Sequence, residues 1–200
     1  MARTQGSRAD ITGPLIREQA LHLFARHGYA AVTMRQIAAA VGVQVGTLYT
    51  YTADKEALLV DLLQTHMEDL LAEWRDPGGD PMDRLQAFAR FHIATSLDRP
   101  EAVFLSYMEL RNLSPKNHAL IAGLRRRYEQ ALEVILRDGQ AEGAMRPQDA
   151  RLTAMALIAM LTGVTNWYRE GGRLNRAAVQ AHYWELVRGA VGGRGAAPLA

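Results

Sequence analysis

Six histidines are the side chains of this sequence best suited to acid–base or metal chemistry: His22, His27, His66, His92, His118 and His182. No two of them have the HExxH spacing that places two zinc ligands on one face of a helix. The chain has no cysteine, which excludes disulfides, thiolate metal sites and cysteine nucleophiles. It also lacks a GxSxG nucleophile elbow and a lysine-containing phosphate-binding loop. We therefore expect no enzyme activity, no cofactor and no metal site.

The charged side chains are unevenly distributed along the chain. Up to Lys55 there are six lysines and arginines and three acidic residues, a net charge of +3. The remaining 145 residues carry 17 basic and 18 acidic side chains, a net charge of −1. A positive excess at one end favours a polyanionic partner for the N-terminal part of the chain.

The length of 200 residues, 48% of them apolar, is enough for one domain or two small ones with a buried core. The uncharged stretch over residues 153–168 is too short and too polar to cross a bilayer. Residues 1–14 lack the apolar core of a signal peptide. We therefore expect a soluble, cytoplasmic protein without a membrane partner.

Apolar residues recur at helical spacing almost throughout, and no segment alternates as a strand does. Pro14 and Gly28 mark the first turn and the end of one helix, and Thr33 with Gln36 has the capping-box spacing. Later helices begin at Asp54, Asp80, Pro100, Ser114 and Pro147. The pattern predicts an all-α fold of about nine helices, three N-terminal and six C-terminal. The predicted domains are residues 1–54 and 55–191, with 1–10 and 192–200 disordered.

The segment from Thr33 to Leu59 has the pattern of a helix-turn-helix. A capped short helix is followed by a turn at Gly42 and by a second short helix over residues 44–51. Burial of the joint leaves one face of the second helix free to enter a DNA major groove. The residues expected in this joint are Ile37, Ala38, Val41, Val43 and Leu48.

These stretches resemble the tetracycline-repressor (TetR) family of bacterial transcription regulators. The matching sequences are LFARHGY at 23–29, TMRQIA at 33–38, VGVQVGTLYTY at 41–51 and DKEALL at 54–59. The resemblance is close over about the first 60 residues, and the rest matches in the layout of its helices. It implies a DNA-reading head followed by a domain that binds a ligand and forms a dimer.

The resemblance also implies roles for individual positions. The residues expected at base edges are Gln44, Val45, Gly46, Thr47 and, as the longest side chain, Arg35. The residues expected at backbone phosphates are Thr33, Tyr49, Tyr51 and Lys55. For Tyr49, packing against the first helix is the alternative.

The sequence departs from the family pattern at two places. Many members carry a small capping residue and a basic residue where this chain has Gln44 and Val45. Valine cannot hydrogen-bond a base edge, although it can contact a thymine methyl group. Thr52 replaces a common aromatic residue, so we expect looser packing before the helix that begins at Asp54.

Residues 151–168 are apolar on more than one face, as expected of a helix that is buried on both sides. With the last helix, this segment is expected to supply half of a four-helix homodimer interface; a purely internal core helix is the alternative. The candidate interface residues are Met155, Ala156, Ala159, Gly163, His182, Tyr183 and Leu186.

Two C-terminal stretches, MELRNLSPKN at 108–117 and TGVTNWYREGGRL at 162–174, resemble the TetR-type repressors that sense acyl-CoA thioesters. Aromatic and methionine side chains could wall a tunnel for an acyl chain, and arginines could bind the CoA phosphates. The candidate ligand-binding residues are Met67, Phe88, Phe91, His92, Phe104, Met108, Arg111, Arg125, Asn166 and Trp167. Ordinary core packing is the alternative for the apolar members, and a hydrogen-bonded core histidine is the alternative for His92.

The expected function is therefore that of a homodimeric repressor of transcription. It would bind a palindromic operator in double-stranded DNA and be released by a small-molecule effector, with an acyl-CoA thioester as the expected class. Two alternatives stay open: a regulator of efflux that responds to a drug or another lipophile, and a helical ligand-binding adaptor without specific DNA binding.

Overall fold

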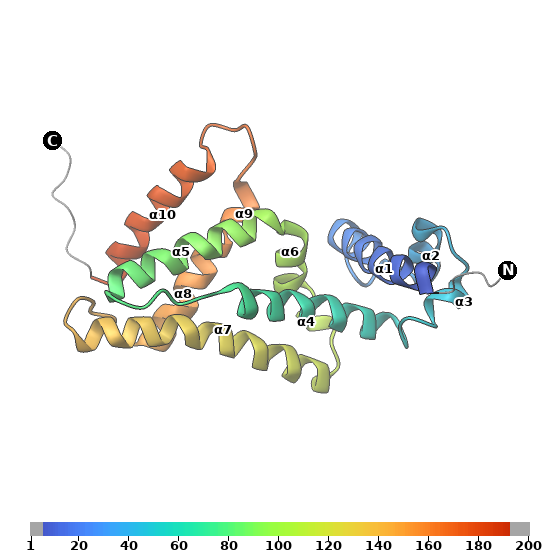
Figure 1. The fold of residues 1–200 in the computed structure, drawn as a ribbon, viewed down its shortest axis with the longest axis horizontal. Helices are drawn as coiled ribbons and strands as arrows, with labels where there is room; N and C mark the ends of the chain where they lie inside the picture. Colours follow the sequence, from blue (N-terminus) through green and yellow to red (C-terminus); the bar gives the residue numbers. More distant parts are fainter. Residues whose placement is uncertain (1–5, 193–200) are drawn as a thin grey trace. The chain divides into compact units, whose positions relative to one another are not determined.

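The computed structural model describes residues 6–192, and these residues form helices joined by turns, with no strand among them (Figure 1). The all-α fold class is therefore confirmed. The first helix, α1, spans Gly6–His27, so residues 6–10 are helical where disorder was predicted. Pro14 therefore lies inside α1, where proline removes one backbone hydrogen bond, and not in the first turn as its position predicted. The rest of the predicted disordered ends lies outside the described residues, apart from Gly192, which lies in a turn.

The described residues divide into two compact units. Unit 1 comprises the described residues up to 68 together with residues 101–123. It contains α1, α2 (Met34–Val41), α3 (Val45–Leu48), the start of α4 (Lys55–Glu73), α6 (Pro100–Met108), the 3-10 helix η1 (Leu110–Asn112) and the start of α7 (Pro115–Ala141). Unit 2 comprises residues 69–100 and the described residues from 124 onward. It contains α5 (Pro81–Asp98), α8 (Ala150–Thr162), α9 (Val164–Trp167), α10 (Arg176–Ala190) and the remaining parts of α4 and α7.

Local sequence signals determine how α2 begins and ends. The Thr33 hydroxyl accepts a hydrogen bond from the Gln36 N–H, and the Gln36 side chain accepts one from the Thr33 N–H, which confirms the capping box. Gly42 ends the helix with φ 76°, a left-handed conformation that favours glycine. In the joint with α3, Ile37 and Leu48 are fully buried. The turn between the two helices is therefore set by residues close to it in the sequence.

The segment α6–η1–α7 is bound to the first helices of unit 1 by two carboxylates. Buried Glu109 accepts a hydrogen bond of 3.2 Å from the backbone N–H of Tyr29, in the loop that follows α1. Glu56, in the first turn of α4, accepts hydrogen bonds of 2.7 Å from the Ser114 N–H and from the Asn117 amide. These hydrogen bonds, the one from Ser114 first, hold the pKa of Glu56 below its ordinary value.

Unit 2 has an aromatic core. Fully buried Phe88 of α5 lies edge-on to Trp74, with ring centroids 5.0 Å apart, and 5.3 Å from the ring of Tyr128 on α7. α5 also packs against α8 and α10 (Figure 1). The last helix is capped by Asn175, whose side chain accepts from the Ala178 N–H. The aromatic contacts therefore join the end of α4 to α5 and α7, and α5 in turn packs against α8 and α10.

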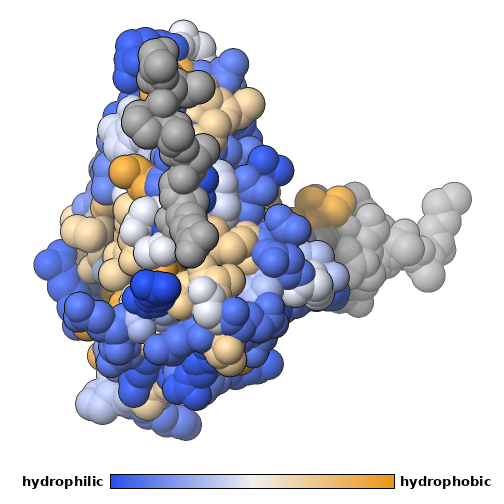
Figure 2. Space-filling view, turned by 90° about the vertical axis from the view of Figure 1, so that its left-hand side faces the viewer, coloured by the Kyte–Doolittle hydropathy of each residue, from blue (hydrophilic) through white to orange (hydrophobic). Residues whose placement is uncertain are grey.

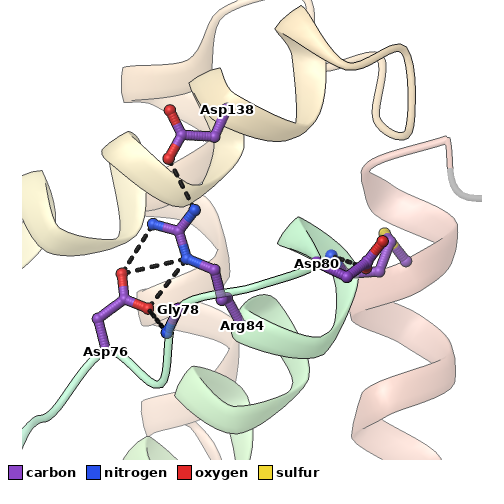
Figure 3. A network of polar contacts seen from close by, with 6 residues as sticks. Asp76, Gly78, Asp80, Arg84 and Asp138 are labelled. Carbon is purple, nitrogen blue, oxygen red and sulfur yellow. Dashed lines mark hydrogen bonds and ion pairs between the residues drawn. The ribbon is translucent and has the colours of Figure 1, made fainter.

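Arg84 joins the loop before α5 to α7 (Figure 3). Its guanidinium donates to both oxygens of Asp76 and, at 2.7 Å, to Asp138. These contacts raise the pKa of Arg84, and the hydrogen bond from Arg84 is the main cause that lowers the pKa of Asp76. The adjacent Asp80 caps α5 by accepting from two backbone N–H groups, as its position before Pro81 predicts. In the described part of the chain, no helix combines the length and apolar character that a membrane crossing needs.

Candidate nucleic-acid interface

In the helix-turn-helix, exposed residues lie beside a buried leucine that anchors α3. Leu48 is completely buried, whereas Gln44, Gly46 and Tyr49 are exposed, Tyr49 by 53%. Val45 and Thr47 are half-buried. The Gln44 side chain makes no capping hydrogen bond, and a Cβ added to Gly46 would meet no atom within 4 Å. This surface is open to a partner that approaches α3 closely.

The start of α2 lies beside this surface in the sequence and offers two kinds of group. Arg35 is exposed in its first turn. The hydroxyl of Thr33 donates to the Gln36 side-chain oxygen at 2.9 Å, so its hydrogen is used within the capping box. A phosphate at this helix start would therefore be bound mainly by the unpaired backbone N–H groups of the first turn.

Lys55 is held within unit 1. Its ammonium donates to the carbonyl oxygens of Tyr29 at 3.0 Å and of Val32 at 2.8 Å, and it lies 4.3 Å from the centroid of the Tyr29 ring. Burial is the main cause that raises the pKa of Tyr29, followed by the charges of Glu56 and Asp54. The resemblance predicts that Lys55 contacts a DNA phosphate; in the structure it binds the loop between α1 and α2. Sequence spacing carries no signal for this role, because its partners lie more than 20 residues away.

Tyr51 belongs to the linker between α3 and α4, residues 49–54, and its ring lies close to α1. A Cβ added to Gly13 of α1 would lie 3.7 Å from this ring, and Tyr51 as a whole is 40% exposed. The hydroxyl of neighbouring Thr52 donates to the Asp54 carbonyl oxygen at 3.0 Å. Tyr51 is therefore positioned by α1 as well as by its own linker.

The ten candidate ligand-binding residues belong to both units. In unit 1, Met67 is buried, and Phe104, Met108 and Arg111 are exposed. In unit 2, Phe88 and His92 are buried, Phe91 and Arg125 are half-buried, and Asn166 and Trp167 are exposed. Next to Arg111, the buried Glu109 binds a loop of its own unit, a role that the sequence motif did not reveal.

Both ring nitrogens of His92 have hydrogen-bond partners in the core of unit 2. Nε2 lies 2.8 Å from the Thr162 hydroxyl, and Nδ1 lies 3.0 Å from the Tyr128 hydroxyl. Because the Thr162 hydroxyl donates to the Ile158 carbonyl oxygen, it accepts from Nε2–H, and Nδ1 then accepts from Tyr128. His92 therefore belongs to a buried chain of hydrogen bonds.

The candidate dimer residues lie on α8 and α10 and at Gly163, which ends α8, and most of them are exposed. Met155 is 44% exposed and Leu186 is 56% exposed. Ala156, Ala159 and His182 are also exposed, whereas Tyr183 is half-buried and stacks on Trp167 with ring centroids 6.2 Å apart. Gly163 is half-buried at the end of α8, where an added Cβ would lie 3.2 Å from the Met160 carbonyl oxygen. Figure 2 shows hydrophobic residues among hydrophilic ones on one face of the molecule.

Comparison with known proteins identifies the family to which this chain belongs. Residues 16–62 match the family described as "Bacterial regulatory proteins, tetR family", and residues 78–191 match "Tetracyclin repressor-like, C-terminal domain". The HTH-type transcriptional repressor KstR2 of Mycobacterium tuberculosis (strain ATCC 25618 / H37Rv) is 29% identical over 196 residues, which cover 96% of this chain and 98% of that protein.

Solved structures agree with this result. A regulatory protein of the tetR family from Rhodococcus RHA1 has a TM-score of 0.87 and 28% identity, with 92% of this chain and 99% of that chain covered. AibR in complex with isovaleryl coenzyme A and operator DNA has a TM-score of 0.80 and 25% identity, with 88% and 97% covered. The matched families consist of transcription regulators, not of enzymes. The chain belongs to the TetR family of helix-turn-helix transcriptional repressors.

Proposed function

We propose that this protein is a homodimeric repressor that binds a palindromic operator and is released by an acyl-CoA thioester. The observation that carries the effector class is the likeness, over 88% of the chain, to AibR, whose structure holds isovaleryl coenzyme A and operator DNA. Exposed residues of the helix-turn-helix, of α8 and α10, and of α6 and η1 support the proposed DNA, dimer and effector contacts respectively.

The exposed residues of α3 and the start of α2 form the proposed DNA-reading surface. Buried Leu48 anchors α3, so Gln44, Gly46 and Tyr49 are held on its outer side. Arg35 is long enough to reach a guanine edge through two hydrogen bonds. In a symmetric dimer, two such surfaces enter major grooves about 34–36 Å apart, or at a multiple of this distance, so the operator is an imperfect palindrome.

The exposed residues of α8 and α10 form the proposed dimer interface. Hydrophobic side chains such as Leu152, Met155 and Leu186 are between 44% and 63% exposed. The opposite face of α8 is buried, as Leu157 and Leu161 show. Exposed apolar surface of this kind commonly marks an interaction site, and two-fold symmetry allows the same surface of two copies to pair. The small residues Ala156 and Ala159 allow two helices to approach closely.

The proposed effector contacts include α6 and η1 of unit 1. Phe104 and Met108 expose apolar surface for an acyl chain, and Arg111 is an exposed cation for a CoA phosphate. Glu109, between them, is hydrogen-bonded to the loop after α1. Because both belong to unit 1, an effector that contacts this segment would also affect the helix-turn-helix through this hydrogen bond. A coupling free energy of about 1–3 kcal/mol, typical of allosteric proteins, would release the operator.

The test is a fluorescence-anisotropy titration of DNA from upstream of the protein's own gene. We expect a specific complex that isovaleryl-CoA weakens and that isovalerate or free CoA leaves intact. Arg111→Ala should reduce the response to the thioester, whereas Lys116→Ala, at another exposed cation of unit 1, should retain it. A specific complex that no thioester affects would refute the effector class. In that case, release by a lipophilic drug would favour a regulator of efflux, and the absence of any specific complex with genomic or selected DNA would favour the adaptor.

A further inference from the structure

Unit 1 contains a cavity of about 440 Å³ that has no role in the function proposed above. It lies between α1, the α3–α4 linker and α4. Its lining comes from Gly13, Pro14, Ile16 and Arg17 of α1, from Tyr51, Thr52 and Ala53 of the linker, and from Ala57, Leu58 and Asp61 of α4. The volume is within the range of about 300–1,000 Å³ found for small-molecule sites.

Small side chains explain why this space is open. Thr52 stands where TetR-type sequences commonly carry an aromatic residue, and its hydroxyl is turned to the Asp54 carbonyl oxygen at 3.0 Å. Ala53 and Ala57 add little volume beside it. The ring of Tyr51 lies against α1 at Gly13 and so forms one wall. The expected looser packing before α4 therefore takes the form of a defined cavity.

The cavity combines an apolar floor with an ionic rim. Ile16 and Leu58 on the floor are only 1% and 3% exposed. At the rim, Nε and Nη2 of Arg17 donate to the two carboxylate oxygens of Asp61, at 2.5 and 2.8 Å. Asp61 is thereby occupied at both oxygens, whereas Nη1 of Arg17 can donate to a further anion. The Tyr51 hydroxyl is a second donor from the linker.

We propose that this cavity binds a small carboxylate with a flat apolar or aromatic body. The body would rest on Ile16 and Leu58, and the carboxylate would accept hydrogen bonds from Arg17 and Tyr51. The site is separate from the effector residues proposed above, and its occupancy does not depend on them. An occupied cavity would hold Tyr51 away from a DNA phosphate; this consequence, unlike binding itself, rests on the proposed function.

The probe for the test is 2-naphthoate, titrated into the full chain by calorimetry, with 2-naphthalenemethanol and 2-naphthylmethylamine as neutral and cationic controls. We expect the anion to bind in preference to both controls. Thr52→Phe should fill the cavity, raise the melting temperature and abolish binding, whereas Thr50→Phe, at an exposed neighbouring position, should leave binding unchanged. The double variant R17Q/D61N keeps hydrogen-bonding groups but removes both charges. It should lower the affinity for naphthoate about tenfold and leave the affinity for the alcohol unchanged.

Three results would overturn the proposal. The first is the absence of naphthoate binding to the unmodified protein at millimolar concentration. The second is unchanged binding in a folded Thr52→Phe variant, which would place the ligand elsewhere. The third is equal affinity for the anion, the alcohol and the amine, which would show that Arg17 does not bind the carboxylate. Circular dichroism of each variant shows whether it is folded and so keeps these results interpretable.

Discussion

Replacing Lys55 by methionine removes an ammonium group but keeps most of the aliphatic stem. The ammonium donates to the carbonyl oxygens of Tyr29 and Val32, at 3.0 and 2.8 Å, and lies over the Tyr29 ring. Each hydrogen bond from a charged donor contributes about 1.5–3 kcal/mol when buried, and the ring contact about 0.5–1 kcal/mol. Because Lys55 is only half-buried, hydrogen bonds to water compensate for part of the lost free energy. We expect the free energy of unfolding to fall by about 2–3 kcal/mol.

Urea denaturation of the full chain measures this effect as a lower midpoint at an unchanged slope. The matched control is Arg35→Met, at an exposed cation, which should change the free energy of unfolding by less than about 0.5 kcal/mol. A pure phosphate contact by Lys55 predicts the opposite pattern: unchanged stability, and a salt dependence of DNA binding that is shallower by about one unit of slope. That pattern would refute the structural role of Lys55.

Further predictions concern DNA reading, assembly, loop anchoring and pH. Arg35→Ala should weaken operator binding by about 1–3 kcal/mol and relax the preference at one base pair; equal losses on all operator variants would contradict base contact. Leu186→Glu should yield monomers in sedimentation velocity, and a persisting dimer would place the interface elsewhere. Glu109→Ala leaves the Tyr29 N–H without its acceptor and should lower the free energy of unfolding by about 1–3 kcal/mol in urea titrations. Because the pKa of Glu56 lies below its ordinary value of 4.5, its charged form stabilises the fold above that pH, and this stabilisation is lost as the pH falls through the lowered pKa. Glu56→Gln should therefore reduce the loss of stability between about pH 5 and pH 3, and an unchanged pH profile would argue against this coupling.

The helix ends could be predicted from the sequence because each depends on atoms a few residues apart. The Thr33 capping box, the turn at Gly42 and the Asp80 cap are all present as expected. The exposure of Gly46, two positions before buried Leu48, also follows from helical spacing, because residues two apart lie on different faces. The start of α1 was predicted wrongly because proline usually marks the first turn of a helix, whereas Pro14 lies inside this one.

The sequence by itself thus determined the all-α class, the helix-turn-helix and the exposed face of α3, through short-range hydrogen bonds and apolar periodicity. Only the tertiary structure decided which distant segments meet. Glu109 binds Tyr29 across 80 residues, Glu56 binds Ser114 across 58, and Lys55 closes the loop after α1. The cavity beside Thr52 likewise needs three segments to form its walls. Such contacts depend on how whole helices pack, and no local spacing in the chain encodes them.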